Sequence, residues 1–365
     1  MSKKIQTLKN NRYIQFSIMA IVVIVVAIVG IKNLNNSQAS SPYVTVQANT
    51  GQLVSPASLV TSSGASTGSY VQFGTQTVTG NSLCGFKTTT PAVSKVMIIW
   101  EENESTSSIV GNGSLPYMNS LMTSCGLTTN YTSYTHPSLP NYMAMTSGVS
   151  YASGPWNGDC LPSASGCTTS NASVFSQLGT NWKGYAESMS GNCDQNPAGS
   201  TDSDGNQVYA PRHNPAVYYT NISSNCANQD VPLGSTTSGA LYSDVSAGTL
   251  PALSTVTPNL SDDWHDGSAS QADNWLKGWI PVITAGSDYQ SGKLAILIIF
   301  DEGAGSGNST SSTIGIWMSA YTKPDTKGGT ATDDYSVTKT VEDLLGLPEL
   351  SNAQSVNSFT SDFNL

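Results

Sequence analysis

The sequence predicts an α/β fold, with a mainly parallel central sheet flanked by helices on both faces. Residues 96–100 and 294–300 are continuous apolar runs of strand length. Strands of this kind are covered on both faces, as in parallel sheets. Helical patterns alternate with the strand patterns, which is the element order of α/β proteins. The 365 residues suffice for one large domain of this class or two small ones.

The first 39 residues are predicted to be a signal peptide or an N-terminal membrane anchor. Four basic residues precede an uninterrupted apolar run at 18–31. This run is shorter than the roughly 20 residues that span a membrane. Small residues on either side of Gln38 suit a cleavage site. Cleavage and retention both remain open, and both predict that the folded part is secreted or held outside the cytoplasm.

Residues 40–90 are predicted to be a spacer, and residues 91–365 the folded domain. The spacer is rich in Ser, Thr and Gly and has little periodicity. A short stretch such as 70–79 is compatible with an edge hairpin. We expect no chemistry in the spacer.

Charge and cysteine content narrow the class of protein. Only 10% of the residues are charged, and the net charge is −10, which argues against a nucleic-acid partner. The six cysteines form no C-x-x-C metal motif and suit disulfides in an oxidising compartment. Cys160 and Cys167 bracket a short loop and are predicted to pair. Cys193–Cys226 and Cys84–Cys125 are the next pairings by proximity in sequence.

Both predicted buried strands end at oxygen-bearing side chains. Glu101, Glu102 and Asn103 close the first strand, and Asp301 and Glu302 follow the second. Ligands of open α/β sheets bind at the carboxyl ends of the strands. The alternative is that these acids merely begin a solvated loop. This interpretation is less convincing when acids follow both strands than when they follow one.

A third strand and turn at 253–259 leads into a dense titratable cluster at 262–266. Metal binding and a solvated acidic loop are the two interpretations. His265 favours metal binding because the chain has only three histidines.

Helices are predicted at 171–178, 271–279 and 337–345. The last of these is amphipathic and is stopped by Gly346 and Pro348. Trp275 and Trp279 lie on one helical face and are predicted to be core residues rather than ligands.

Ser138 lies in a rigid frame between Pro137 and Pro140, ahead of an apolar stretch that could begin a helix. Backbone N–H groups and the helix dipole favour an anion at such a junction. A nucleophile that attacks phosphate needs this setting. A proline-rich surface turn with a capping serine is the alternative.

Several motifs occur in a specific order along residues 96–353. They include Glu-Asn at 102–103, His-Pro-Ser-Leu-Pro-Asn-Tyr at 136–142, Trp-Lys-Gly-Tyr-Ala-Glu-Ser-Met at 182–189, Arg-His-Asn-Pro at 212–215, Asp-Glu at 301–302 and Tyr-Ser at 335–336. Together they resemble the phosphoesterase family of bacterial and fungal acid phosphatases and phosphatidylcholine-type phospholipases C. This family belongs to the alkaline phosphatase superfamily, so the resemblance implies an alkaline-phosphatase-like sheet and helices.

The resemblance implies that Ser138 attacks phosphorus and forms a phosphoserine that water hydrolyses. It also implies that a divalent metal activates this serine, and hard oxygen ligands favour Ca²⁺, Mg²⁺ or Mn²⁺ over Zn²⁺. The expected metal ligands are Glu102, Asn103, Ser138, Asp301 and Glu302. Asn141 is expected to donate to a phosphate oxygen, and His265 either to bind a second metal or to protonate the leaving group. His136, Arg212 and His213 are the expected phosphate contacts.

A second metal is expected to be weak or absent. Members of the acid phosphatase branch often carry a histidine before the Tyr-Ser motif, where this chain has Asp334. The candidate ligands of a second ion are Asp262, Asp263, Asp266 and Asp334.

A secreted phosphomonoesterase of broad specificity is therefore the favoured function, with a phosphate monoester as substrate and a membrane contact only through the N-terminal segment. A phospholipase C-like enzyme is the first alternative, although the loops near Ser138 are rich in Ser, Thr and Gly rather than apolar. A surface binding protein with a relic site and a nuclease are disfavoured by the intact ligand set and by the acidic charge.

Overall fold

The computed structural model describes all residues except 1–56, 62–68, 74–81, 198–207 and 308. The chain divides into two compact units, residues 1–79 and 80–365. In the first unit, β1 (Ala57–Thr61) pairs antiparallel with β2 (Ser69–Phe73). The predicted signal peptide or anchor lies outside the described residues. Within the part of the chain that is described, no helix combines the length and apolarity of a membrane span.

The second unit is built on an eight-stranded sheet in the order β12-β4-β11-β9-β3-β8-β6-β7. The five strands from β9 to β7 are parallel to one another, and β11 runs antiparallel between β9 and β4. The predicted fold class is thus confirmed, with β11 as an antiparallel insertion. The strands are β3 (Lys95–Glu101), β4 (Gly126–Thr128), β6 (Trp182–Ala186), β7 (Asp230–Pro232), β8 (Leu253–Thr257), β9 (Leu294–Phe300), β11 (Gly315–Met318) and β12 (Thr326–Gly328).

A smaller three-stranded sheet lies in the same unit. It has the order β10-β5-β13, with β5 (Tyr131–Ser133) between β10 (Ser311–Thr313) and β13 (Thr332–Asp333). Because β5 leads into the Ser138 segment and β13 leads into α11, this sheet joins two parts of the candidate site.

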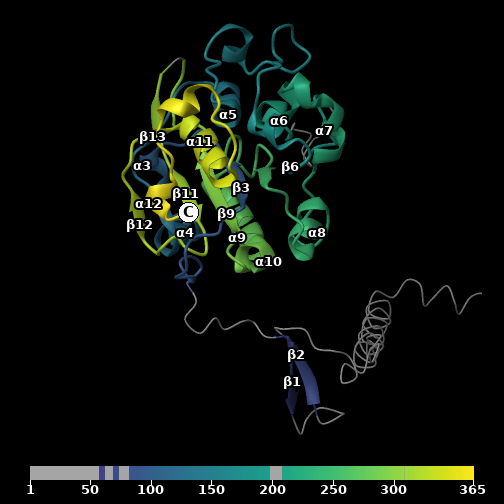
Figure 1. Ribbon diagram of the computed structural model, residues 1–365, viewed down its shortest axis with the longest axis vertical. Helices are drawn as coiled ribbons and strands as arrows, with labels where there is room; N and C mark the ends of the chain where they lie inside the picture. The colour runs from purple at the N-terminus through teal and green to yellow at the C-terminus, as the bar shows by residue number, and fades with distance from the viewer. Residues whose placement is uncertain (1–56, 62–68, 74–81, 198–207, 308) are drawn as a thin grey trace, which may run out of the picture. The chain divides into compact units, whose positions relative to one another are not determined.

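The large sheet is covered on both faces, which explains why its central strands are apolar throughout. Side chains of β9 alternate, with Ile296 and Ile298 in one core cluster and Leu297 and Ile299 in the other. One cluster is completed by α4 (Pro116–Ser124), α8 (Ala240–Ala247) and α9 (Ala269–Ala285). The other is completed by α5 (Ser138–Ser147), α6 (Val174–Leu178), α11 (Asp334–Leu345) and α12 (Thr360–Phe363). In Figure 1, β3 and β9 run side by side among these helices.

Capping side chains decide where three helices begin. Ser173, Ser268 and Asp333 each accept a hydrogen bond from a backbone N–H of the first helical turn. The first helix therefore begins at Val174, later than the predicted residue 171. The other two begin before the predicted residues 271 and 337. The other α-helices in the described residues are α3 (Thr106–Ile109), α7 (Ser223–Gln229) and α10 (Ser287–Gln290).

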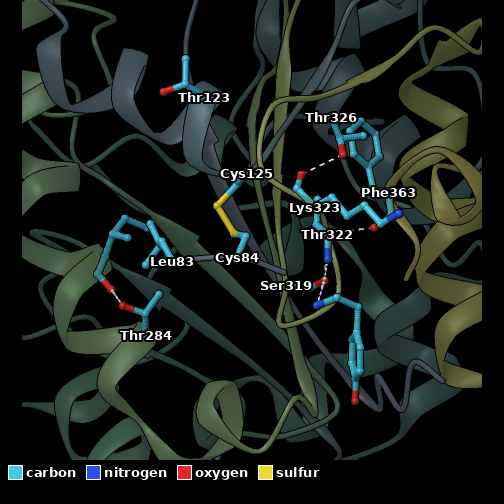
Figure 2. The surroundings of a disulfide bond; sticks show 12 residues. Leu83, Cys84, Thr123, Cys125, Thr284, Ser319, Thr322, Lys323, Thr326 and Phe363 are labelled. Atoms are coloured by element: carbon cyan, nitrogen blue, oxygen red, sulfur yellow. Dashed lines mark hydrogen bonds between the residues drawn. A yellow bond between two sulfur atoms is a disulfide. The ribbon is translucent and has the colours of Figure 1, made fainter. Parts of the chain in front are cut away.

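The three disulfides are Cys84–Cys125, Cys160–Cys167 and Cys193–Cys226. Figure 2 shows the first of them beside the Ser319–Thr322 turn, where the Gly85 N–H donates to the Ser319 carbonyl. The Cys84–Cys125 disulfide ties the beginning of the second unit to the end of α4. Three disulfides indicate an oxidising compartment outside the cytosol.

Candidate active site

The carboxyl ends of β3 and β9 bring the two predicted acid pairs together. These strands are parallel neighbours, with Glu101 opposite Phe300. Each pair directly follows its strand, and the Asn103 N–H donates a 3.3 Å hydrogen bond to Asp301 Oδ1. Glu102 and Glu302 belong to the same buried edge of the sheet.

Ser138 is the first residue of α5 and lies among these carboxylates. Its side chain is 2% exposed, and Oγ donates a 3.0 Å hydrogen bond to Glu102 Oε2. The other Glu102 oxygen accepts from the Tyr142 hydroxyl, one helical turn further along. The Ser138 hydroxyl also lies near enough to Asp301 to lower the pKa of that acid slightly against the larger effect of burial. The serine is therefore held by Glu102, and Asp301 of the other strand lies beside it.

Asn141 and His136 both contact Glu302. Asn141 Nδ2 donates to Glu302 Oε2 at 2.8 Å and to the Thr135 carbonyl at 3.0 Å. His136 Nδ1 lies 3.1 Å from the same Glu302 oxygen. Asn141 Oδ1 and His136 Nε2 are buried and have no hydrogen-bond partner among the described residues. Burial lowers the pKa of His136.

His213 bridges two acids on the other side of Glu102. Its Nδ1 lies 3.0 Å from Asp263 Oδ2, and its Nε2 lies 3.1 Å from Glu102 Oε1. The ring stacks on Tyr142 at 5.3 Å between ring centroids. Burial and the nearby Arg212 lower the pKa of His213, so a neutral ring is favoured.

Burial and mutual repulsion make the carboxylates hard to ionise. Burial and Asp301 raise the pKa of Glu302 to about 10, and burial raises the pKa of Asp301 to about 7. Burial, then Asp301, raises the pKa of Glu102 well above its ordinary value. A divalent cation would relieve this repulsion.

The donor set fits such a cation. Asp301 Oδ2 is buried without a hydrogen-bond partner in the described part of the chain, as expected of an oxygen that can take a metal. Carboxylate, amide and hydroxyl oxygens are the ligands preferred by Mg²⁺, Ca²⁺ and Mn²⁺. The five oxygen-bearing residues expected as ligands all lie at this edge.

The four acids proposed for a second ion are dispersed. Asp262 lies beside Glu187, Asp263 contacts His213, and Asp266 Oδ1 lies 2.7 Å from His265 Nδ1. Asp334 accepts from the Tyr131 hydroxyl and from the Tyr134 N–H at 3.1 Å. A different group gathers instead: one potential ligand atom each from Glu102, His213 and His265 lies within 4.8 Å of the others.

Two acidic side chains near the site, Asp159 and Glu101, are not among the site residues predicted from the sequence. Asp159 Oδ1 accepts a 2.9 Å hydrogen bond from the Leu139 N–H, and Oδ2 lies 3.6 Å from Arg212 Nε. Glu101 is fully buried, and both its carboxylate oxygens are without a hydrogen-bond partner in the described residues. Burial, then Asp263, raises the pKa of Glu101. Asp159 is separated from every predicted motif, and the sequence pattern marks Glu101 only as the end of a strand.

An open groove of about 570 Å³ borders the site. Two of its lining residues, Ser105 and Ala304, lie two positions beyond Asn103 and Glu302, and the Ala304 N–H donates to Ser105 Oγ at 3.0 Å. The lining carries no charge. It consists of Ser105, Thr106, Ser107, Val110, Ala304, Thr310, Ser311 and Ser312.

Comparison with known proteins gives one family. Residues 111–348 match the phosphoesterase family. The chain is 30% identical over 276 residues to a phosphatidylinositol-3-phosphatase of Mycobacterium tuberculosis, covering 74% of this chain and 83% of that protein. It is 29% identical over 177 residues to a phosphate-repressible acid phosphatase of Penicillium chrysogenum, covering 48% of this chain and 41% of that protein.

Solved structures of low sequence identity also align with the chain. A member of the alkaline phosphatase superfamily from Vibrio parahaemolyticus matches with a TM-score of 0.48 and 11% identity, over 76% of each chain. A mutant alkaline phosphatase of the Antarctic bacterium TAB5, with Mg bound in its M3 site, matches with a TM-score of 0.41 and 11% identity. That alignment covers 71% of this chain and 100% of the other.

Proposed function

Since this chain belongs to the phosphoesterase family and is an acid phosphatase-like hydrolase of phosphate esters, we propose that Ser138 is its nucleophile and phosphomonoesters its substrates. The observation that carries the proposal is the Ser138 hydroxyl, which begins α5 and donates to Glu102 at 3.0 Å. A buried serine beside a carboxylate acceptor at a helix N-terminus suits attack on an anion.

The reaction proceeds by attack of Ser138 Oγ on phosphorus. The Oγ–P bond forms, the bond from phosphorus to the leaving-group oxygen breaks, and the serine proton passes to Glu102. His265 protonates the departing oxygen from Nε2, which can carry a proton only after Arg212, its present donor, turns to the phosphoryl group. His136, Arg212 and His213 contact the phosphoryl oxygens, and the unpartnered Nε2 of His136 supports its part in this set. Water then hydrolyses the phosphoserine and restores the enzyme.

Glu102, Asn103, Ser138, Asp301 and Glu302 would hold a divalent cation, with Mg²⁺, Ca²⁺ or Mn²⁺ favoured over Zn²⁺. When bound, this ion supplies Lewis-acid stabilisation of the serine alkoxide and of the negative phosphoryl oxygens. Asn141 Nδ2 donates to Glu302 and to the Thr135 carbonyl, so Asn141 positions the first turn of α5, and its donation to a phosphoryl oxygen requires the release of one of these bonds.

The protein acts outside the cytoplasm in this proposal. Its three disulfides support an oxidising compartment, and residues 1–39 would direct export as a signal peptide or remain as an anchor. The mass of the mature exported protein distinguishes cleavage from retention.

Hydrolysis of p-nitrophenyl phosphate by the full chain tests the activity, and Ser138→Ala tests the nucleophile. We expect turnover by the wild type, and loss of turnover in Ser138→Ala with an unchanged melting temperature. Ser147→Ala is a matched control because it removes a buried hydroxyl from the other end of α5. Turnover that survives in Ser138→Ala would refute the nucleophile. Release of phosphocholine from phosphatidylcholine, in place of monoester hydrolysis, would refute the substrate class.

A further inference from the structure

Asp159 joins the nucleophile helix to the cationic side of the site. One carboxylate oxygen accepts from the N–H of Leu139, the residue after Ser138, at 2.9 Å. The other oxygen lies 3.6 Å from Arg212 Nε, which makes an ion pair rather than a hydrogen bond. Arg212 Nη2 lies 3.1 Å from His265 Nε2. A single carboxylate therefore links α5, Arg212 and, through it, His265.

The loop that carries Asp159 is anchored on both sides. Before it, the buried Trp156 packs against Tyr151 and Tyr218, at 4.7 and 5.9 Å between ring centroids. After it comes the Cys160–Cys167 disulfide, and the Cys160 carbonyl accepts a 2.9 Å hydrogen bond from the Tyr218 hydroxyl. Asp159 itself adopts a left-handed conformation with φ of 48°, which aspartate tolerates better than most residues.

The anchored position of Asp159 can restrict the long, flexible side chain of Arg212. An unpaired Arg212 would have to be ordered by each incoming phosphate, at a cost in side-chain entropy. A carboxylate on a fixed loop holds the guanidinium in place before substrate arrives. We propose that Asp159 is a positioning residue that orients Arg212 towards the phosphate beside Ser138, and that the Cys160–Cys167 disulfide holds Asp159 there. This inference rests on the proposed function.

The carboxylate could instead repel phosphate, and the sign of one substitution separates the two roles. Asp159→Asn keeps an oxygen for the Leu139 N–H but removes the charge that holds Arg212. We expect KM for p-nitrophenyl phosphate and Ki for inorganic phosphate to rise together by about 10-fold, with kcat within about 3-fold, as for binding lost equally in ground and transition states. Unchanged or lower KM and Ki would overturn the positioning role.

A matched control and a double-mutant cycle exclude a merely structural effect. Lys183–Asp244 is an ion pair of similar exposure outside the site, so Asp244→Asn should leave KM unchanged. If Asp159 acts through Arg212, the effects of Asp159→Asn and Arg212→Gln should not add in the double variant. Additive effects would overturn this route.

The disulfide is tested in the same assay. Cys160→Ser/Cys167→Ser should raise KM and phosphate Ki in the same direction as Asp159→Asn, whereas Cys84→Ser/Cys125→Ser, assayed below its melting transition, should not. Equal KM values in wild type and Cys160→Ser/Cys167→Ser would overturn the assigned role of this disulfide.

An inactive wild type would refute the proposed function. Normal kinetics of Asp159→Asn beside an inactive Ser138→Ala would refute only the role of Asp159.

Discussion

Ser138 and Glu102 are 36 positions apart in the sequence, yet the Ser138 hydroxyl donates a 3.0 Å hydrogen bond to Glu102 Oε2. We expect Glu102→Gln to reduce kcat by about 10²–10⁴-fold, because the amide cannot take the serine proton and binds a cation poorly. Steady-state kinetics and metal analysis of the purified variant check this. Glu104→Gln, the same change two residues further along, should retain activity. Wild-type kcat in Glu102→Gln would contradict the assigned base.

Removal of the divalent cation should abolish activity and weaken the fold. Without a cation, Glu102, Asp301 and Glu302 repel one another in a buried site. Prolonged dialysis against a chelator should therefore lower turnover and the melting temperature, since a ligand of the native state stabilises it by mass action. Mg²⁺, Mn²⁺ or Ca²⁺ should restore both better than Zn²⁺. Full activity in protein shown to be free of metal would disprove this prediction.

The buried carboxyl of Asp230, which is not an expected metal ligand, should make the stability of the protein depend on pH. Burial raises its pKa from 3.8 to about 7, and its Oδ1 has no hydrogen-bond partner in the described structure. An acid with a raised pKa in the folded state contributes stability that is complete below about pH 4 and is lost as the pH rises through 7. The loss amounts to at most about 4 kcal/mol for a shift of about three units.

We therefore expect Asp230→Asn to gain unfolding free energy relative to wild type between pH 5 and pH 8, measured by urea unfolding. The amide cannot ionise and can still accept the hydrogen bond that Asn214 donates at 2.8 Å. Asp343→Asn, on the exposed side of α11, is the control and should show little change over this range. A difference between Asp230→Asn and wild type that is independent of pH would contradict the buried-acid explanation.

Leu297 tests the double-sided core. Its side chain is 0% exposed in the middle of β9, so Leu297→Ala should lower the unfolding free energy by about 2–5 kcal/mol through lost burial and a cavity. Leu161→Ala, at a side chain that is 39% exposed, should change it by less than about 0.5 kcal/mol. Denaturant unfolding of both variants gives the comparison. Equal losses would show that β9 is not buried as described.

Local patterns in the sequence were sufficient for the central strands and for the residues that follow them. The apolar run at 294–300 coincides with β9, because a strand buried on both faces must be apolar at every position. Glu102 and Asp301 follow parallel strands, so their meeting at one edge was predictable. The disulfide Cys160–Cys167 followed from proximity alone. Helix starts were less accurate, because the capping serine or aspartate had to be chosen among many similar residues.

Tertiary structure alone decided the contacts between residues far apart in the chain. Asp159 reaches Arg212, 53 positions away, because the residues on either side of it, Trp156 and Cys160, pack against Tyr218. Asp334 turns to Tyr131 and Tyr134 rather than to Asp262, Asp263 and Asp266, because β13 pairs with β5. The residue types and their spacing determined the chemistry that the chain carries. Which of those groups touch depends on sheet order and loop packing, and no short sequence pattern encodes either.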